Sequence, residues 1–280
     1  MLALGLALGA ALAWGTADFL GGLTTRGLRV FAVLLVSQGF GLLLVGLLVL
    51  VRGEAAPTAG QIVAGVLAGF ALAVGLGALY QGMAVGVMSV VSPISATGAA
   101  IPIVFGLARG ERPSLLQGAG IVAALAGVML ISRQEENDAA RRRAGRAGIA
   151  LGVVAAVGFG VFFVGIDLAA EGGVVWATLL QRLGLLAAVA IAVALVRPSL
   201  AVPRRLLPAL LAIGVLDLSA TMLFTAATQE GLTSLVSVIA SLYPAATIAL
   251  ALLVLGERLN RLQQGGAALV LAGVALIAGG

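Results

Sequence analysis

The 280-residue chain contains no cysteine and no histidine, and all 16 of its basic residues are arginine, so it also lacks lysine. Without cysteine there is no disulfide, no thiolate metal site and no thiol nucleophile. Without histidine the commonest general base and the usual zinc ligand are missing. Without lysine a phosphate-binding loop ending in Gly-Lys cannot form, which excludes ATP-driven pumping by this chain alone. We therefore expect no cofactor, no metal ion and no catalytic residue.

Charge is also scarce: 10% of the residues are charged and 61% are apolar, with a mean hydropathy of +1.19. Soluble domains carry about 25% charged residues, so the composition predicts an all-α integral membrane protein whose surroundings are the lipid bilayer. The net charge of +5 does not indicate a nucleic-acid partner, because the arginines lie in short breaks between apolar runs instead of forming a basic stripe. The expected location is the cell (plasma or inner) membrane, with several spans.

Ten apolar segments are each long enough, at about 20 residues, to cross a bilayer. The first lacks a preceding arginine and is followed by many similar runs, so we interpret it as a span and not as a signal peptide. Residues 61–108 carry no charge but are too long for one crossing, which requires two spans there with a turn near Gly82. The predicted spans are 2–23, 30–51, 59–80, 86–107, 114–132, 147–168, 174–196, 206–229, 232–254 and 262–279.

The chain repeats itself. A shift of 146 residues places Gly110-Glu111-Arg112 on Gly256-Glu257-Arg258, and 12 of the 22 positions from residue 110 to 131 become identical. Val51-Arg52 at the end of the second span likewise corresponds to Val196-Arg197 at the end of the seventh. The predicted organisation is a first five-helix repeat (1–132), a solvated polar linker (133–146) and a second five-helix repeat (147–280).

Five crossings in each repeat determine how the two copies are related. After an odd number of crossings the second copy must enter from the opposite face of the membrane, so the repeats are inverted. Inverted repeats are typical of secondary transporters, in which two halves expose one midplane site alternately to each side.

The same residues resemble a known family. Three patterns are similar to the EamA family of the drug/metabolite transporter superfamily: ALAWGTADFLGG in the first span, SLYP separated by twelve residues from Glu257, and GER followed by Leu-Gln and a glycine-rich helix in each half. The resemblance implies a central cavity formed by the first four helices of each half, peripheral fifth and tenth helices, and export of amino acids or other small metabolites. One departure is that the counterpart of Pro244 in the first half is not proline.

Arg182 and Asp217 lie at similar depth in neighbouring predicted spans. One interpretation is a structural ion pair that carries charge through lipid. The other is a binding site, in which Arg182 holds a substrate carboxylate and Asp217 takes an amino group or a coupling proton. The sequence leaves both open.

Five further residues are candidates for substrate binding. Asp18 is either a gate or proton site or a side chain that reaches the membrane surface, and Trp14 lies one turn from it. Ser37 and Gln38 fall near the level of Arg182 in the opposite half, where hydrogen bonds between helices are the alternative role. Tyr243 can face substrate or mark the membrane interface.

Pro93, Pro102 and Pro244 interrupt helical hydrogen bonding within predicted spans. In transporters such breaks expose backbone groups to a binding site, whereas elsewhere they produce a simple kink. The GER turn is expected to stop one helix and cap adjacent helix ends.

The distribution of arginine does not settle the orientation. Loops after odd-numbered spans hold 12 arginines and loops after even-numbered spans hold three, which predicts that both termini lie outside the cell. The family resemblance implies the reverse.

The leading hypothesis is a secondary transporter, not an enzyme, that exports a small polar, amino-acid-like substrate by alternating access, with proton coupling as a further hypothesis. The alternative is a membrane-embedded enzyme acting on a lipid or lipid-linked substrate, for which the sequence offers no cluster of catalytic carboxylates. Substrate identity and oligomeric state stay open.

Overall fold

The computed structural model describes residues 1–53, 55–85, 88–131, 139–255 and 261–280. Within these ranges all regular secondary structure is helical. Seven helices are long and apolar enough to cross a membrane, and three shorter apolar helices bring the set to ten. The all-α fold with ten spans is therefore confirmed.

The first half follows the predicted spans closely. Its fourth span is broken by a single 3₁₀ turn, η1 (Thr97–Ala99), which separates two short helices. Its helices are α1 (Leu2–Thr24), α2 (Val30–Arg52), α3 (Ala59–Val85), α4 (Met88–Ala96), α5 (Ala100–Ala108) and α6 (Leu115–Ile131).

The second half repeats this pattern, including a broken fourth span. The break here lies at Ser241 and Leu242, between two helices that continue in the same span. Its helices are α7 (Ala139–Ala170), α8 (Val174–Val196), α9 (Leu207–Glu230), α10 (Thr233–Ala240), α11 (Tyr243–Leu255) and α12 (Arg261–Gly279), with a 3₁₀ turn η2 (Arg204–Leu206) before α9.

Two boundaries differ from the sequence-based expectation. The helix α7 already begins at Ala139, inside the segment predicted to be a linker, and residues 132–138 lie outside the described part of the chain. The helix α3 continues past Gly82 to Val85, so the Tyr-Gln-Gly sequence does not form the turn. Tyr80, within this helix, is buried inside the protein (1% exposed).

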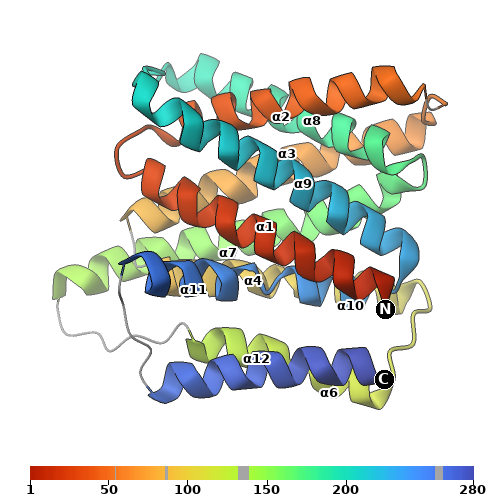
Figure 1. Cartoon of the computed structure of the whole chain (residues 1–280). Helices are drawn as coiled ribbons and strands as arrows, with labels where there is room; N and C mark the ends of the chain where they lie inside the picture. Colours follow the sequence, from red (N-terminus) through yellow and green to blue (C-terminus); the bar gives the residue numbers. More distant parts are fainter. Residues whose placement is uncertain (54, 86–87, 132–138, 256–260) are drawn as a thin grey trace.

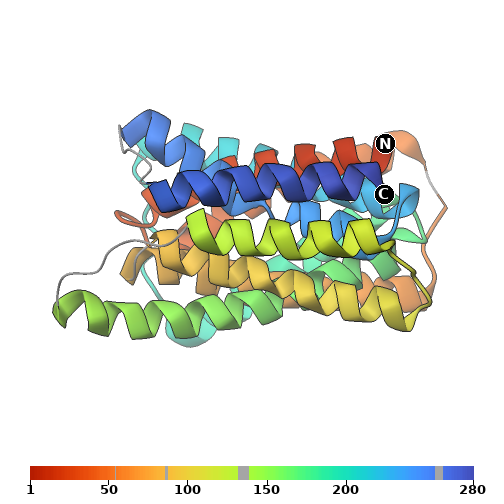
Figure 2. The ribbon, with the colours of Figure 1, turned by 90° about the horizontal axis from the view of Figure 1, so that it is seen from below.

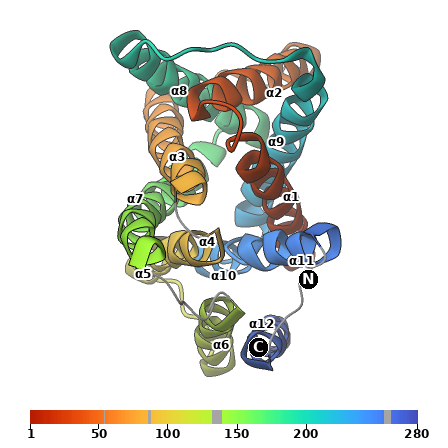
Figure 3. The same cartoon turned by 90° about the vertical axis from the view of Figure 1, so that its left-hand side faces the viewer.

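Helices α6 and α12 pack against each other, apart from the remaining bundle (Figures 1 and 3). Glycines permit their close approach: a Cβ on Gly120 would lie 2.7 Å from the carbonyl oxygen of Gly273, and one on Gly127 would lie 2.8 Å from that of Gly266. Small residues at such an interface let helices pack closely in a membrane. In contrast, a Cβ added to Gly5 would have open space around it, so Gly5 makes no close helix contact.

The main bundle is built from contacts between the halves. Helix α1 packs on α9, α3 packs on α7 and α8, and α2 packs on α8 and α9. Both termini lie at the same end of the bundle (Figure 2), as an even number of crossings requires. Large apolar side chains such as Leu43, Leu195 and Leu253 remain exposed on the outer surface, where the bilayer replaces water as their surroundings.

Two glycines mark equivalent helix crossings in the two halves. Gly69 of α3 faces the backbone of Gln181 and Leu185 in α8, and Gly214 of α9 faces the backbone of Ser37 in α2. They are 145 residues apart, the spacing that also relates Val51-Arg52 to Val196-Arg197. Each half therefore presses its third helix onto the second helix of the other half at the same point.

Candidate functional site

A cavity lies at the centre of the bundle between the two halves. The open space between atoms is about 300 Å³, of which about 20 Å³ admits the centre of a water molecule, room for about one water. The cavity is thus narrow in this conformation. It is lined by residues of both halves: Trp14 and Asp18 of α1, Leu72 and Leu76 of α3, Phe159, Phe162 and Phe163 of α7, Asp217 of α9 and Tyr243 of α11.

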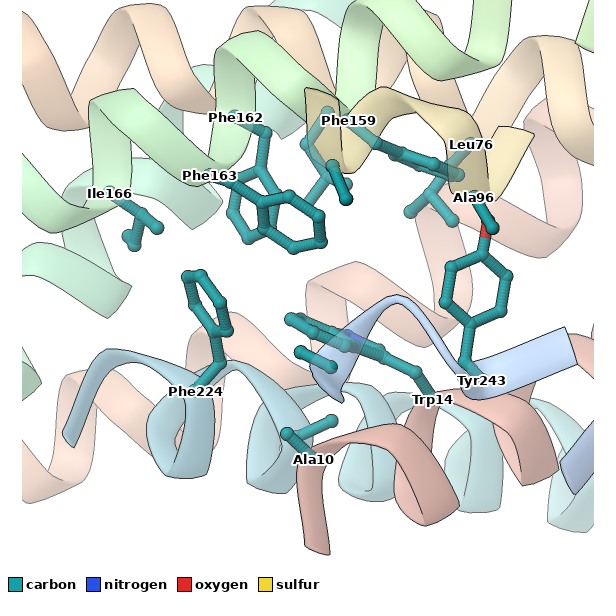
Figure 4. Close-up of a cluster of buried hydrophobic side chains, with 14 of the residues drawn as sticks. Ala10, Trp14, Leu76, Ala96, Phe159, Phe162, Phe163, Ile166, Phe224 and Tyr243 are labelled. Carbon is teal, nitrogen blue, oxygen red and sulfur yellow. The ribbon is translucent and has the colours of Figure 1, made fainter. Parts of the chain in front are cut away.

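Aromatic rings fill most of this centre. The Trp14 ring lies 5.8 Å from that of Phe163 and 5.6 Å from that of Phe224, and Phe163 lies 4.7 Å from Phe224, between ring centroids. These separations lie in the range of favourable aromatic pairs. Figure 4 shows Trp14 and Phe224 on one side facing the phenylalanines of α7 on the other.

Asp18 is the first of two carboxylates at the cavity. It is 4% exposed, interacts with the Tyr80 side chain of α3, and lies within electrostatic range of Asp217. An inward carboxyl at this depth differs from a side chain that reaches for the membrane surface. Asp18 therefore places an acidic side chain at the centre of the protein.

Asp217 is the second carboxylate, and it forms an ion pair with Arg182 of α8. The Nη1 and Oδ2 atoms are 2.7 Å apart, and both side chains are almost fully buried. The contact lacks the alignment of a hydrogen bond, and Nε and Nη2 of Arg182 have no hydrogen-bond partner among the described residues. Arg182 does not line the cavity, and its guanidinium lies against Gly41 of α2. Asp217 thus connects Arg182 to the cavity lining.

Ser37 and Gln38 of α2 are fully buried but are not among the residues that line the cavity. The Ser37 hydroxyl donates to the Val33 carbonyl oxygen within its own helix, at 2.8 Å. The Gln38 amide has no hydrogen-bond partner in the described part of the chain. Of the predicted site residues, the structure thus gathers Trp14, Asp18, Asp217 and Tyr243 at the cavity, and it leaves Arg182, Ser37 and Gln38 behind its wall.

Tyr243 joins the two broken spans across the cavity. Its hydroxyl hydrogen-bonds to the Ser95 hydroxyl of α4 in the opposite half, and its ring meets that of Phe159 edge-on, at 6.1 Å between centroids. One turn along α11, the Thr247 hydroxyl donates to the Gly15 carbonyl oxygen of α1 at 3.0 Å.

The three prolines lie at different places relative to the helix breaks. Pro244 is the second residue of α11 and Pro102 the third residue of α5, so each follows an interruption. Helix starts tolerate proline because the missing N–H has no partner there in any case. Pro93 lies within α4, without a break in the helix.

At the end of the bundle that carries both termini, the GER turn of the first half (residues 110–112) is hydrogen-bonded to the second half. The Glu111 carboxylate accepts hydrogen bonds from the backbone N–H groups of Thr233 (3.0 Å) and Ser234 (3.1 Å), and from the Ser234 hydroxyl. These groups form the first turn of α10, where a negative charge is stabilised by the helix dipole. Arg109 also pairs with Glu171 across the halves at 3.4 Å, on the surface. Glu257, the repeat counterpart of Glu111, lies outside the described residues.

Replacing Glu111 by glutamine is expected to loosen this end, because the amide has no charge and only one accepting oxygen. The chain has no cysteine, so the accessibility of a single Ser237→Cys in α10 can be measured with a small water-soluble maleimide. We expect labelling to become about threefold faster or more in Glu111→Gln, as the loss of one to two charge-assisted hydrogen bonds implies. The exposed neighbour Arg112→Gln is the matched control, and equal labelling in both variants would contradict a closing role for Glu111.

The comparisons with known proteins fit this architecture. The sequence profile of the EamA-like transporter family matches twice, at residues 1–133 and 146–279. The chain belongs to the EamA-like transporter family. It is therefore a multi-pass membrane transporter, and its family is one of transporters and not of enzymes.

Solved structures support the same fold for this EamA-like protein. One of 28 matching chains, described only as the crystal structure of a protein, covers 98% of this chain and 95% of its own length, with a TM-score of 0.78 and 17% identity. That likeness concerns the fold alone. Among curated proteins none matches.

Sequence reasoning missed the phenylalanines of α7. Three of the nine phenylalanines of the chain occur within five residues, at Phe159, Phe162 and Phe163. At helical spacing they cover one face, and that density was the available signal. No group of three or more potential metal ligands occurs in the described residues.

Proposed function

We propose that this EamA-like transporter exports a small polar, amino-acid-like metabolite by alternating access, in exchange for protons. The observation that carries the proposal is the central cavity, because residues of α1 and α3 from one repeat and of α7, α9 and α11 from the other line it together. A site formed between inverted repeats is reached from opposite sides as the halves rock against each other.

The narrowness of the cavity fits a conformation in which the two halves have closed against each other. The aromatic rings touch one another in the centre, and Glu111 ties the GER turn to α10 at one end. Admission of a substrate therefore requires the rings to separate and one end to open. Rocking of two packed halves supplies such a motion without unfolding any helix.

The carboxylates suit exchange of a substrate for a proton. An ammonium group stabilises a charged carboxylate, whereas a proton neutralises it, so the two compete for Asp18. Competition of this kind couples the two fluxes, because the halves can return with either the substrate or the proton but do not carry both. A buried carboxylate in a span is a common element of such relays.

Purified protein in liposomes tests the function. With labelled phenylalanine, leucine and phenethylamine as probes, we expect at least one to show counterflow that depends on unlabelled substrate inside the vesicles, and accumulation that follows an imposed pH gradient. The matched control is protein-free liposomes of the same lipid. Absence of counterflow for every ammonium-bearing probe would overturn the proposal. Counterflow that does not respond to the pH gradient would contradict proton exchange.

The direction is tested in cells. Expression should lower the internal concentration of a loaded substrate and raise the external one. An increase of the internal concentration would contradict export.

A further inference from the structure

We infer that the cavity recognises an organic cation, a protonated amine attached to an aromatic or apolar body, and that a carboxylate on the substrate is not bound. This inference rests on the proposed transport through the same site, and it changes the substrate class from amino-acid-like metabolites to amines that lack a carboxylate. It depends on the balance of charge at the cavity and on the chemistry of its wall.

Among the described residues that line the cavity, two are acidic and none is basic. The buried charged side chains of the described residues are Asp18, Asp167, Arg182 and Asp217. Arg182 and Asp217 neutralise each other at 2.7 Å, and Asp167 bonds to Thr233 away from the cavity lining. Asp18 is left without a cationic partner, facing Asp217 across the centre. A positive group in the cavity would lie near both carboxylates.

No positive side chain of the described residues lines the cavity. The nearest cation, Arg182, is 0% exposed and already engaged with Asp217. A substrate carboxylate that entered would lose its hydration, would meet two acidic side chains and would find no free cation among the described lining residues. Burial of an unpaired charge of this kind is strongly unfavourable.

The wall of the cavity suits a cation with an apolar body. The faces and edges of Trp14, Phe162 and Phe163 surround the centre, and Phe224 packs against all three rings. Aromatic faces attract cations and also stack on an aromatic or apolar substituent. The ring-to-ring contacts seen in the narrow cavity would then be exchanged for ring-to-substrate contacts.

Three probes of similar shape separate the contributions of the ammonium and carboxylate groups to binding: phenethylamine (cation), phenylalanine (zwitterion) and phenylacetate (anion). Binding is followed by the fluorescence of Trp14 in a Trp176→Phe background, since the chain has only two tryptophans. We expect phenethylamine to bind at least about tenfold more tightly than phenylalanine, since an unpaired buried carboxylate costs more than the 1.4 kcal/mol that a tenfold ratio represents. Phenylacetate should not bind. Tighter binding of phenylalanine or phenylacetate than of phenethylamine would overturn the inference.

Single substitutions test which side chains contribute to phenethylamine binding. Asp18→Asn should weaken phenethylamine binding by about tenfold or more, whereas Asp167→Asn, a buried carboxylate of α7 outside the cavity lining, should leave it unchanged. Phe163→Leu keeps the apolar volume but removes the aromatic face, and should weaken phenethylamine about threefold or more. Equal binding in Asp18→Asn and Asp167→Asn would contradict the assignment, and so would undiminished binding in Phe163→Leu. The probe series on the Trp176→Phe protein decides the inference even where a variant fails to fold.

The result is separable from that of the proposed function. Tight phenethylamine binding without flux of any probe would support the substrate class and overturn transport of these compounds. Flux of phenylalanine or phenylacetate together with weak phenethylamine binding would support transport and overturn the substrate class.

Discussion

Replacing Arg182 by leucine is expected to destabilise the folded protein by about 3–5 kcal/mol, because Asp217 would remain buried without its cation. The Oδ2 atom of Asp217 lies 2.7 Å from the guanidinium, and Asp18 lies within electrostatic range. Without Arg182, the buried Asp217 carboxylate would have no cation beside it and would still lie within electrostatic range of Asp18. The apparent melting temperature in detergent measures the effect, and Arg109→Leu, in an exposed ion pair with Glu171, is the control with an expected loss of at most about 1 kcal/mol.

The double variant Arg182→Leu, Asp217→Leu separates the two interpretations of this pair. Removal of both charges should restore most of the stability, since apolar side chains often replace a buried ion pair without loss. Transport should nevertheless be lost, because Asp217 lines the cavity. A stable double variant with unchanged flux would instead assign the pair a purely structural role. A double variant as unstable as the single one would contradict the pairing.

Much of the fold could be predicted because the thickness of the bilayer sets the length of every span, and the rarity of charged residues marks each span independently of the others. The long uncharged stretch from residue 61 to 108 needed two spans on length alone, and the structure has them. The exact turn could not be predicted: Gly82 suits a turn, but in a helix packed on both sides its lack of a side chain admits Val91 and Leu151 instead. Packing between distant segments decided the role of that glycine.

The site could be predicted in part, for a similar reason. Asp18 and Asp217 were conspicuous because a charge in a span is costly, and both lie at the cavity. Whether Arg182 faces that cavity depends on how α8 is rotated against α2 and α9, which an almost uniformly apolar helix does not reveal. Phe224 and the phenylalanines of α7 are ordinary apolar residues in the sequence, and only the approach of α7 to α1 makes them one aromatic cluster.

The second large effect is expected at the duplicated helix crossings. A Cβ on Gly69 would lie 2.6 Å from the backbone nitrogen of Leu185 and closer still to the Gln181 carbonyl oxygen, and one on Gly214 would press on the Ser37 carbonyl oxygen. Backbone atoms cannot rotate away as a side chain does, so the helices must separate. We expect Gly69→Ala and Gly214→Ala each to lower stability by about 1–3 kcal/mol, measured as the apparent melting temperature.

Gly77 and Gly46 are the matched controls, since both lie in membrane-spanning helices with nothing near an added Cβ. Alanine there should be neutral or slightly stabilising through helix propensity, by up to about 1 kcal/mol. The comparison also tests the inverted repeat, because Gly69 and Gly214 belong to different halves and are equivalent only if one backbone geometry occurs twice. If the geometry is duplicated, the two substitutions should lower stability by similar amounts. A loss of stability at one position alone would mean that the halves pack differently. Gly69 contacts the turn of α8 that carries Arg182, and Gly214 lies one turn from Asp217. Moving the helices apart at either crossing should therefore also disturb the ion pair between Arg182 and Asp217.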